Sequence, residues 1–465
     1  MSSEIGIRDS GFDVGGKRVT VAGAARSGIA ASELLASKGA RVTLSDTRER
    51  VPEAEHLAAL GVSLELGGHQ AETFTSADLV VLSPGVPPAQ PIIQAARDRG
   101  IPVIAEIELA FRWLRGRVIA ITGTKGKSTT TALTGRMLAA AGFKVTVGGN
   151  IGAPLSAQVP ASTPDTLHVV ETSSFQLEQI DTFHPWIAVM LNLSADHLDR
   201  HPTFDAYADA KARIFENQAS TDWSVVNADD PTVLALARRG RAATRLFARA
   251  ASLEAGTVVA DGWIVERGTG VDRRLVPLSA VHLLGPHLVA DVMAAATVGA
   301  IAGATSNAMT EAVDSFMGLE HAMELVAEVD GVRFVNDSKA TNIDAALKSI
   351  ESFERGVVPI VGGRFKGGRF ERLAPALRQR AKAVVAIGEA KPELVRALSD
   401  AVPIREAETL RDAVTQAFEL ARPDGVVLLA PACASFDMFR DYAERGTRFK
   451  EEVRRLVSGE QSSAG

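Results

Sequence analysis

The stretch ITGTKGKSTTTAL, Ile121–Leu133, places a glycine-rich loop between an apolar run and a helical pattern. Backbone N–H groups of such a loop can face a phosphate, and the following helix adds its positive end. The loop GTKGKS, Gly123–Ser128, is two residues shorter than the common G-x-x-x-x-G-K-[ST] pattern. Lys127 can reach the outer phosphates of a nucleotide, while Ser128 or Thr129 can bind Mg²⁺. The stretch therefore predicts a nucleotide-binding domain.

The same alternation of strand, glycine turn and helix occurs on both sides of this loop. Lys17–Asp46 reads VTVA, GAARSG, a helical pattern and RVTLSD, and the last third of the chain contains VRFVNDS, VVPIVGG, KAVVAIG and GVVLLAPA. Such alternation predicts parallel sheets covered on both faces, with ligands beyond the carboxyl ends of the strands. We expect a three-domain α/β protein: Rossmann-like at 1–115, ATPase-type with a mostly parallel sheet at 116–318, and Rossmann-like at 319–465. The less regular stretch Thr221–Ser279 predicts a small antiparallel insert.

Composition and charge are those of an ordinary globular protein. The 465 residues are 46% hydrophobic and 23% charged, which allows sizeable cores. A net charge of −6 argues against a general nucleic-acid binder, because phosphate backbones require clustered positive charge. The start MSSEIGIRDSGFDVGG and the absence of a long apolar span predict neither a signal peptide nor a membrane helix. Cys433, the only cysteine, suits a reducing cytoplasm, and we interpret it as a packing residue.

Three polar residues outside the loop are candidates for chemistry. Glu171 ends the strand-like run LHVVET, where a carboxylate can bind a metal ion that also holds phosphates. His197, in NLSADHLDRH, follows the next such run and is a candidate metal ligand. Lys211 lies on the apolar face of the helical pattern AYADAKARIFEN. A buried lysine is costly unless its amine reaches solvent, pairs with a charge or is modified, and the pattern leaves all three explanations open.

Together with further motifs, these stretches resemble the Mur ligases. The motifs are, in chain order, GTKGKST, GGNIG (Gly148–Gly152), ETSSFQLE (Glu171–Glu178), NLSADHLDRH, DAKARIFEN, VNADD (Val226–Asp230), NDSKATN (Asn336–Asn342) and PACASFDMF (Pro431–Phe439). The last two are typical of the members that add glutamate. The resemblance implies that the three domains bind a UDP-sugar, ATP and an amino acid, in that order.

The resemblance also implies a reaction. Such an enzyme uses ATP and Mg²⁺ to add D-glutamate to the peptidoglycan precursor UDP-N-acetylmuramoyl-L-alanine, and we expect a cytoplasmic monomer. ATP would phosphorylate the alanyl carboxylate, and the amine of glutamate would then displace phosphate from this acyl phosphate. Because a carboxylate is a poor electrophile, the phosphoryl group supplies the leaving group that amide formation needs.

Roles are implied residue by residue at the matching motifs. The residues implied for ATP are Gly123, Thr124, Lys125, Gly126, Lys127, Ser128, Thr129, Asp337 and Lys339. Those implied for metal are Ser128, Glu171, His197 and Lys211, the last as a carbamate formed from CO₂. Those implied for the UDP-sugar are Arg26, Ser27, Asp46, Thr47, Arg48, Ser83, Gly85, Asn150 and Ser173. Those implied for glutamate are Thr341, Lys366, Ser435 and Phe436. The implied catalytic group is Lys127, Glu171, His197, Lys211 and Lys339.

The chain departs from the family pattern at three positions. Leu288 and Asp291 stand where the family usually has the asparagines of HN-x-x-N near the adenine, and Ala322 stands where it has the arginine of His-Arg. Leucine and alanine side chains donate no hydrogen bonds, so we expect altered nucleotide seating rather than loss of activity. The alternatives are a sister ligase, a silent nucleotide-binding or scaffold protein, and a nicotinamide oxidoreductase based on the first glycine turn.

Overall fold

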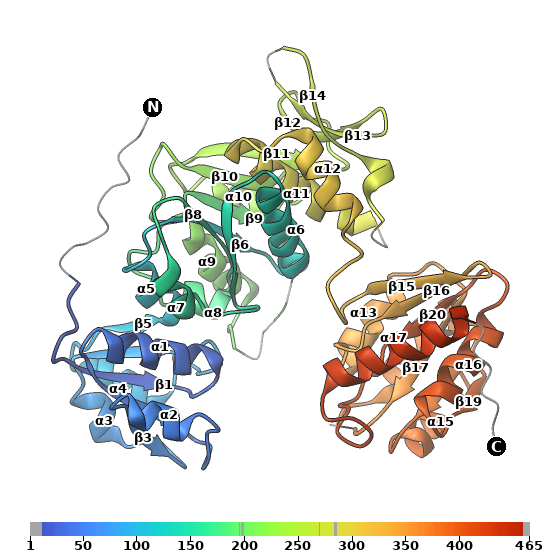
Figure 1. The fold of residues 1–465 in the computed structure, drawn as a ribbon, viewed down its shortest axis with the longest axis horizontal. Coiled ribbons are helices and arrows are strands. Elements are labelled where there is room, and N and C mark those ends of the chain that lie inside the picture. Colours follow the sequence, from blue (N-terminus) through green and yellow to red (C-terminus); the bar gives the residue numbers. More distant parts are fainter. Residues whose placement is uncertain are drawn as a thin grey trace. The chain divides into compact units, whose positions relative to one another are not determined.

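The computed structural model describes residues 12–194, 196, 200–268, 270–282, 286–365 and 367–458, with the backbone alone at 286 and 287. The chain forms three α/β domains, each built on its own sheet (Figure 1), which confirms the predicted fold class. The first two sheets belong to one compact unit, Met1–Val281 with Val289–Asp314, and the third to a second unit, His282–Leu288 with Ser315–Gly465. The exact domain boundaries stay predictions. No helix in the described ranges combines the length and apolar character needed to cross a membrane.

The N-terminal domain is a parallel five-stranded sheet in the order β3-β2-β1-β4-β5. Its strands are β1 (Arg18–Ala22), β2 (Arg41–Asp46), β3 (Ser63–Leu66), β4 (Leu79–Leu82) and β5 (Val103–Ala105). Its helices are α1 (Arg26–Ser37), α2 (Ala54–Ala59), α3 (Ala71–Thr75) and α4 (Pro91–Asp98), followed by α5 (Glu106–Phe111). The strand order reverses at β1, so the carboxyl ends of β1, β2 and β4 lie together at the edge where sheets of this kind commonly bind ligands.

The central domain is built on a nine-stranded sheet in the order β14-β13-β12-β11-β10-β9-β6-β8-β7. Its strands are β6 (Arg117–Thr122), β7 (Lys144–Gly149), β8 (Thr166–Glu171), β9 (Ile187–Met190), β10 (Trp223–Asn227), β11 (Ala243–Ala248), β12 (Gly256–Ala260), β13 (Trp263–Arg267) and β14 (Arg273–Pro277). Its helices are α6 (Lys127–Ala140), α7 (Leu155–Gln158), α8 (Ser174–Leu177), α9 (Phe204–Ala212), α10 (Pro231–Ala237), α11 (Pro286–Ala302) and α12 (Ser306–Asp314), with 3₁₀ turns η1 (Val159–Ala161), η2 (Arg213–Phe215) and η3 (Leu278–Ala280). Strands β8 and β9 are buried along their whole length, as expected where helices cover both faces of a parallel sheet.

The separate insert predicted for Thr221–Ser279 is wrong in part. Strands β10 and β11 continue the main sheet in parallel, and only β12, β13 and β14 pair antiparallel. The helix α10 provides the crossover that a parallel pair requires, and the middle of β10 is buried against the sheet's helices. The stretch is therefore the outer part of the central sheet.

Helix α5 joins the N-terminal and central domains through two buried glutamates, Glu106 and Glu108, and Glu106 accepts from the Ser156 N–H at 2.6 Å. Glu108 accepts hydrogen bonds from the backbone N–H groups of Asp181, Thr182 and Phe183, at 2.9, 3.0 and 2.8 Å. Leu34 of α1 belongs to the same hydrophobic cluster as the central strands β6, β8 and β9. These contacts explain why the two domains form one compact unit.

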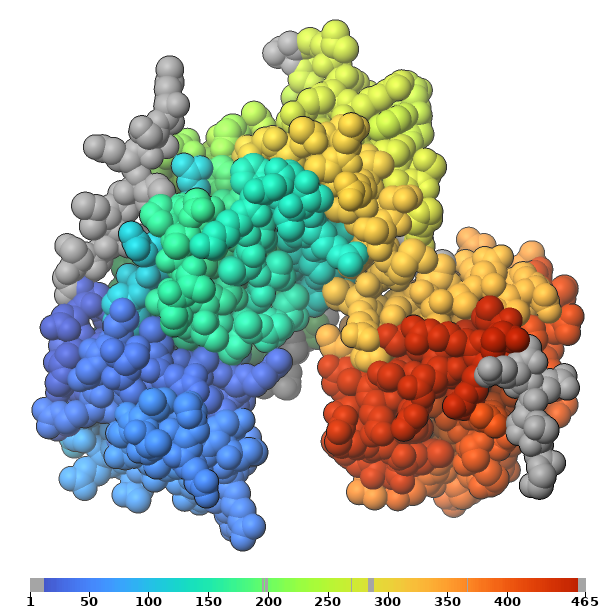
Figure 2. Space-filling view, viewed as in Figure 1, coloured from blue at the N-terminus to red at the C-terminus, as the bar shows by residue number. Residues whose placement is uncertain are grey.

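The C-terminal domain has six strands in the order β15-β16-β20-β17-β18-β19, parallel except for β15. Its strands are β15 (Glu324–Val329), β16 (Val332–Asn336), β17 (Val357–Gly362), β18 (Val384–Ile387), β19 (Ile404–Glu406) and β20 (Val426–Leu429). Its helices are α13 (Ile343–Glu351), α14 (Ala374–Arg380), α15 (Lys391–Leu398), α16 (Leu410–Ala421) and α17 (Tyr442–Ser458), with the 3₁₀ turn η4 (Phe370–Leu373). Figure 2 shows α17 (red) on the face turned to the viewer. Phe449 and Val453 of this helix pack onto the sheet.

Candidate active site

The glycine-rich loop lies between β6 and α6, as the sequence predicted. Gly123 and Gly126 have φ values of 151° and 81°, which L side chains rarely adopt. Gly126 caps α6, so the free N–H groups of the first helical turn open onto the loop. The Asn192 side chain holds the loop, because it accepts from the Lys125 N–H at 2.9 Å and donates to the Lys125 carbonyl at 3.0 Å. The loop is therefore preorganised for an anion.

Glu171, at the end of β8, lies beside the first turn of α6. Its Oε2 accepts a 2.6 Å hydrogen bond from Ser128 Oγ, and its Oε1 accepts one of 2.9 Å from Asn150 Nδ2. Ser173, two residues further on, caps α8 by accepting from the backbone N–H of Gln176. The structure thus brings two predicted metal ligands next to two residues predicted to contact the UDP-sugar.

The oxygens of Ser128 and Glu171 form a hard donor pair that suits Mg²⁺. Among the described residues, no group of three His, Cys, Asp or Glu side chains could hold a metal ion. Mg²⁺ keeps several waters and is usually bound by one or two carboxylates together with substrate phosphates. His197, another predicted ligand, lies outside the described residues.

Lys211 extends from α9 into the base of the phosphate loop. Its Nζ donates to the Gly123 carbonyl oxygen at 3.0 Å and to Thr122 Oγ1 at 3.3 Å. The side chain is 2% exposed, which excludes the explanation that the amine reaches solvent. Burial, followed by the positive charge of Lys127, lowers the pKa of Lys211 to about 7. A large share of the amine is therefore uncharged at neutral pH and able to react as a nucleophile.

Asp291, one of the three departures, lies directly against the phosphate loop. It is 4% exposed, and a Cβ atom on Gly126 would lie 2.1 Å from its Oδ1. Its Oδ2 has no hydrogen-bond partner within the described part of the chain. Burial raises the pKa of Asp291 to about 7. Where the family usually has an amide, this chain has a titratable carboxyl that touches the loop.

At the carboxyl edge of the N-terminal sheet, Asp46 is held by its neighbours. Its Oδ2 accepts from the Ala24 N–H at 2.5 Å, and its Oδ1 accepts from the Arg48 N–H at 2.8 Å and from Arg48 Nε at 3.0 Å. Burial alone would raise the pKa of Asp46, but the hydrogen bonds from Arg48 and Ala24 outweigh it and lower the pKa to about 2. The carboxylate is therefore ionised and oriented.

A Cβ on Gly28 would lie 1.8 Å from the Gly23 carbonyl oxygen, so only glycine lets α1 approach the turn after β1.

The other predicted UDP-sugar residues of this domain lie in loops or a helical turn at the same edge. Arg26 and Ser27 open α1, and Arg26 is exposed. Thr47 and Gly85 are exposed in the loops after β2 and β4. Ser83 is buried and donates to the carbonyl of the turn after β1 at 2.8 Å, so it shapes the turn.

In the C-terminal unit, backbone hydrogen bonds join three motif loops. The Ala432 N–H donates to the Ala340 carbonyl at 2.9 Å, and Arg364 and Ala434 exchange hydrogen bonds of 2.9 and 3.0 Å. These bonds connect the NDSKATN loop, the loop after β17 and the PACASFDMF loop. The loops that carry the predicted glutamate residues therefore form one assembly.

The predicted glutamate residues differ in exposure within this assembly. Ser435 is buried, Thr341 is partly exposed, and Phe436 is 58% exposed. Lys366 lies outside the described residues. Cys433 is fully buried in the hydrophobic core, in agreement with a packing role.

The two predicted residues of the NDSKATN loop face different surroundings. Lys339 is exposed, whereas Asp337 is buried and accepts hydrogen bonds from Ser349 Oγ and from the Met323 N–H, the latter at 3.3 Å. Burial raises the pKa of Asp337. Ala322, the third departure, pairs through its backbone with Leu319 ahead of this loop.

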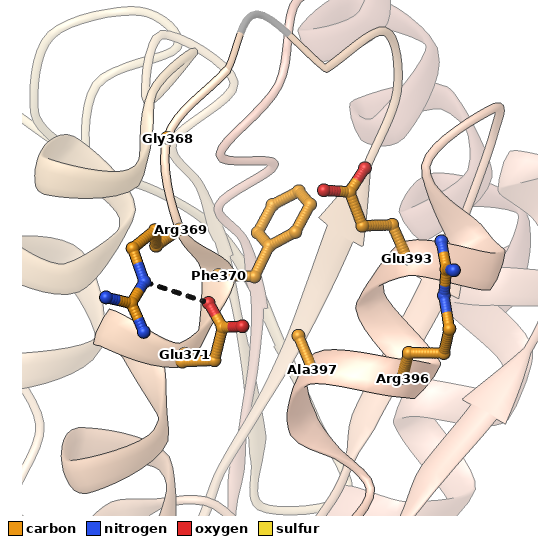
Figure 3. A pocket seen from close by; sticks show the side chains of 7 residues that line it. All are labelled: Gly368, Arg369, Phe370, Glu371, Glu393, Arg396 and Ala397. Atoms are coloured by element: carbon orange, nitrogen blue, oxygen red, sulfur yellow. Dashed lines mark ion pairs between the residues drawn. The ribbon is translucent and has the colours of Figure 1, made fainter.

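A surface hollow of about 260 Å³ lies between η4 and α15 (Figure 3). Arg369 and Glu371 face each other there at 3.8 Å, and α15 contributes Glu393 and Arg396 on the other side. The charges balance, and Thr341, Ser435 and Phe436 do not line the hollow. It is not the predicted glutamate site.

Two residues that shape the phosphate loop, Tyr207 and Asn192, were not predicted from the sequence. Tyr207 places its hydroxyl 3.0 Å from Thr124 Oγ1, and its ring lies 4.9 Å from the Lys211 amine. Asn192 holds Lys125, as described above. Both had a detectable signal, because Tyr207 stands one helical turn before Lys211 and Asn192 stands two residues after the end of β9.

Comparison with known proteins places this geometry in a family context. Residues 17–105, 121–299 and 322–433 match the N-terminal domain of MurD-like Mur ligases, the Mur ligase middle domain and the Mur ligase glutamate ligase domain. The UDP-N-acetylmuramoylalanine–D-glutamate ligases of Koribacter versatilis and Geobacter metallireducens are each 45% identical over 453 residues, which is 97% of this chain and 100% of theirs.

Solved structures share the fold at lower identity. The UDP-N-acetylmuramate–alanine ligase of Thermotoga maritima is 20% identical with a TM-score of 0.55, over 96% of this chain and 100% of that one. MurF ligase from Thermotoga maritima, solved in complex with ADP, is 17% identical with a TM-score of 0.55, over 95% of this chain and 96% of that one. At these identities the likeness shows the fold alone.

Proposed function

The chain belongs to the Mur ligase family, and we propose that it joins D-glutamate to UDP-N-acetylmuramoyl-L-alanine while converting ATP to ADP and phosphate. One observation carries the choice of substrate: 45% identity, over nearly the whole chain, to enzymes that bear the name of this reaction. The product is a peptidoglycan precursor. The site geometry supports the chemistry, since it combines a phosphate loop, an oxygen donor pair and a buried reactive lysine.

The central domain binds the triphosphate and activates the acid. The N–H groups at the start of α6 and the Lys127 amine bind the phosphates and offset the repulsion between triphosphate and carboxylate. When bound to Ser128 and Glu171, Mg²⁺ supplies further positive charge to the transferring phosphoryl group. Asn150, which already contacts Glu171, binds the sugar nucleotide beside this centre.

Lys211 is proposed to carry a carbamate. Its uncharged amine attacks CO₂, a C–N bond forms and the nitrogen loses one proton to solvent, so that a neutral amine becomes an anionic carbamate. Its pKa of about 7 and its burial against the loop support this step. The carbamate would add a second anionic group to the metal site near Glu171. It would also remove the cost of burying a lysine cation beside Lys127.

The outer domains are proposed to bind the two substrates that are joined, the UDP-sugar and glutamate. The ionised Asp46 and its neighbour Arg48 receive the uridine diphosphate end, with the turn residues Arg26 and Ser27 at the start of α1. In the C-terminal unit, Thr341, Lys366, Ser435 and Phe436 hold glutamate, and Lys339 acts on the acyl phosphate. The amine of glutamate attacks the acyl carbon, the amide C–N bond forms, and the C–O bond to phosphate breaks.

We propose that the reaction takes place in the cytoplasm, since its substrates are ATP and a UDP-linked precursor, and that the enzyme acts as a monomer. The test is direct. Purified protein is mixed with ATP, Mg²⁺ and UDP-N-acetylmuramoyl-L-alanine, each glutamate enantiomer is offered separately, and the product is identified by mass spectrometry. Amide product with D-glutamate alone supports the proposal.

Other outcomes identify the alternatives. Product with a different amino acid points to a sister ligase, and the absence of phosphate release with every substrate points to a silent nucleotide-binding protein. Tight NADH binding without ligase turnover would favour the oxidoreductase.

A further inference from the structure

We infer that Arg445 is a positioning residue of the glutamate site. It holds the loop that carries Lys339 and the loop that carries Ser435 in one arrangement. The inference rests on the proposed function and assigns a role to a residue outside every motif discussed above. Arg445 stands on α17, which follows the PACASFDMF loop in the chain.

Arg445 donates hydrogen bonds to both the NDSKATN loop and the PACASFDMF loop. Its Nε donates to Ser338 Oγ at 2.9 Å and its Nη2 to the Ser338 carbonyl oxygen at 2.8 Å. Its Nη1 donates to the Cys433 carbonyl oxygen at 3.2 Å. Ser338 directly precedes Lys339, and Cys433 stands two residues before Ser435. One guanidinium group therefore fixes the backbone on both sides of the predicted glutamate site.

The charge of Arg445 is buried and forms no direct ion pair among the described residues. The side chain is 3% exposed, and Asp437 attracts it electrostatically without bonding to it. Burial lowers the pKa of Arg445 to about 10, so the group stays charged at neutral pH. A buried cation whose hydrogen bonds all go to neutral acceptors costs folding free energy that a serine or leucine would not. Its cost is explained if the positions of its acceptors matter for binding an acidic amino acid close by.

The surrounding backbone shows why a guanidinium is needed. Ala432 has a φ of 58°, unusual for a residue with a side chain, and its N–H donates to the Ala340 carbonyl of the other loop. Apart from Arg445, this bond and the pair exchanged by Arg364 and Ala434 hold the strained turn beside Ser435, and all three are neutral backbone bonds. Three charge-assisted bonds from a planar fork supply the stronger restraint.

The test compares Arg445→Met, Arg445→Lys and Ser338→Ala with the exposed control Arg448→Met, one turn further along α17. Steady-state kinetics are measured for D-glutamate and for the UDP-sugar, with melting temperature as a fold check. We expect Arg445→Met to raise the KM for D-glutamate by about tenfold or more. The KM for the UDP-sugar and the kinetics of Arg448→Met should match the wild type. Arg445→Lys, which keeps the charge and can reach one acceptor, should fall between, and Ser338→Ala should shift the same KM less.

The outcomes separate this inference from the proposed function. A wild type without glutamate-dependent product refutes both. An active wild type whose Arg445 variants lose activity equally toward both substrates, in step with melting temperature, shows a purely structural arginine and overturns the inference. If Arg445→Met fails to fold, the glutamate KM of Arg445→Lys and Ser338→Ala decides, and unchanged values count against the positioning role.

Discussion

Gly126 and Asp291 are so close that a single added carbon atom on the glycine would lie 2.1 Å from the aspartate Oδ1. Gly126 also has a φ of 81°, so two independent constraints select glycine at the cap of α6. One constraint is backbone conformation, and the other is the departure from the family pattern at position 291. Glycine at position 126 is therefore required both by the backbone conformation of the phosphate loop and by the contact with Asp291 of α11.

Replacing Gly126 with alanine should weaken binding of an ATP analogue by at least about tenfold, because the left-handed backbone costs an L residue about 1–2 kcal/mol and the collision adds to it. Isothermal titration calorimetry measures the affinity. Gly142→Ala is the matched control, since Gly142 has a φ of 86° but nothing within 4 Å of an added Cβ. The double variant Gly126→Ala/Asp291→Ala should regain part of the affinity. Equal affinities in the single and double variants would show that Asp291 does not constrain the loop.

Replacing Lys211 with alanine should remove most activity, and added bicarbonate should not restore it. The amine is the only atom that can form the proposed carbamate, and its hydrogen bonds to Gly123 and Thr122 are lost as well. Activity is followed as phosphate release, and the carbamate itself by ¹³C NMR after addition of labelled CO₂. Undiminished turnover in the variant would contradict the carbamate role.

The carbamate signal of the wild type should depend on pH. Since the pKa of Lys211 is about 7, the uncharged amine is scarce at pH 6 and dominant at pH 8. At a fixed pressure of CO₂, the labelled signal should therefore rise over this range. A signal already complete at pH 6, or absent at pH 8, would be inconsistent with a buried lysine of this pKa.

Replacing Lys127 with alanine should abolish acyl phosphate formation. The residue opens α6, its Nζ bonds the loop at the Thr124 carbonyl at 3.0 Å, and it offsets the charge of the transferring phosphoryl group. Trapping of the acyl phosphate by borohydride reduction measures the step before glutamate is needed. Lys144→Ala, an exposed lysine in β7 of the same domain, should behave as the wild type. Normal ATP-dependent product from Lys127→Ala would remove the phosphate-loop assignment.

Replacing Glu106 with glutamine should stabilise the folded protein more at pH 8 than at pH 5. Glu106 is buried, its Oε1 accepts from the Ser156 N–H at 2.6 Å, and burial raises its pKa to about 7. Ionisation is therefore easier in the unfolded chain, so its penalty is absent below about pH 4.5 and complete above about pH 7. The penalty has a ceiling of about 3 kcal/mol, because one pKa unit is worth about 1.4 kcal/mol.

The check on Glu106 is the difference in melting temperature between variant and wild type at the two pH values. The exposed Glu55 in the same unit provides the control, and Glu55→Gln should show the same difference at both. A difference for Glu106→Gln that shrinks between pH 5 and pH 8 would mean that the folded protein favours the ionised carboxylate.

The sequence by itself determined the three α/β domains, the strand–loop–helix around Gly123–Ser128 and the candidates at strand ends, because local periodicity and glycine positions encode these features directly. Tertiary structure alone decided what Lys211, Asp291 and Arg445 contact. Helical periodicity places a side chain on a face, but its partners come from strands and loops distant in the chain. The pKa values of Lys211 and Asp291 depend on burial by those distant elements, and so does the union of two motif loops by one guanidinium group.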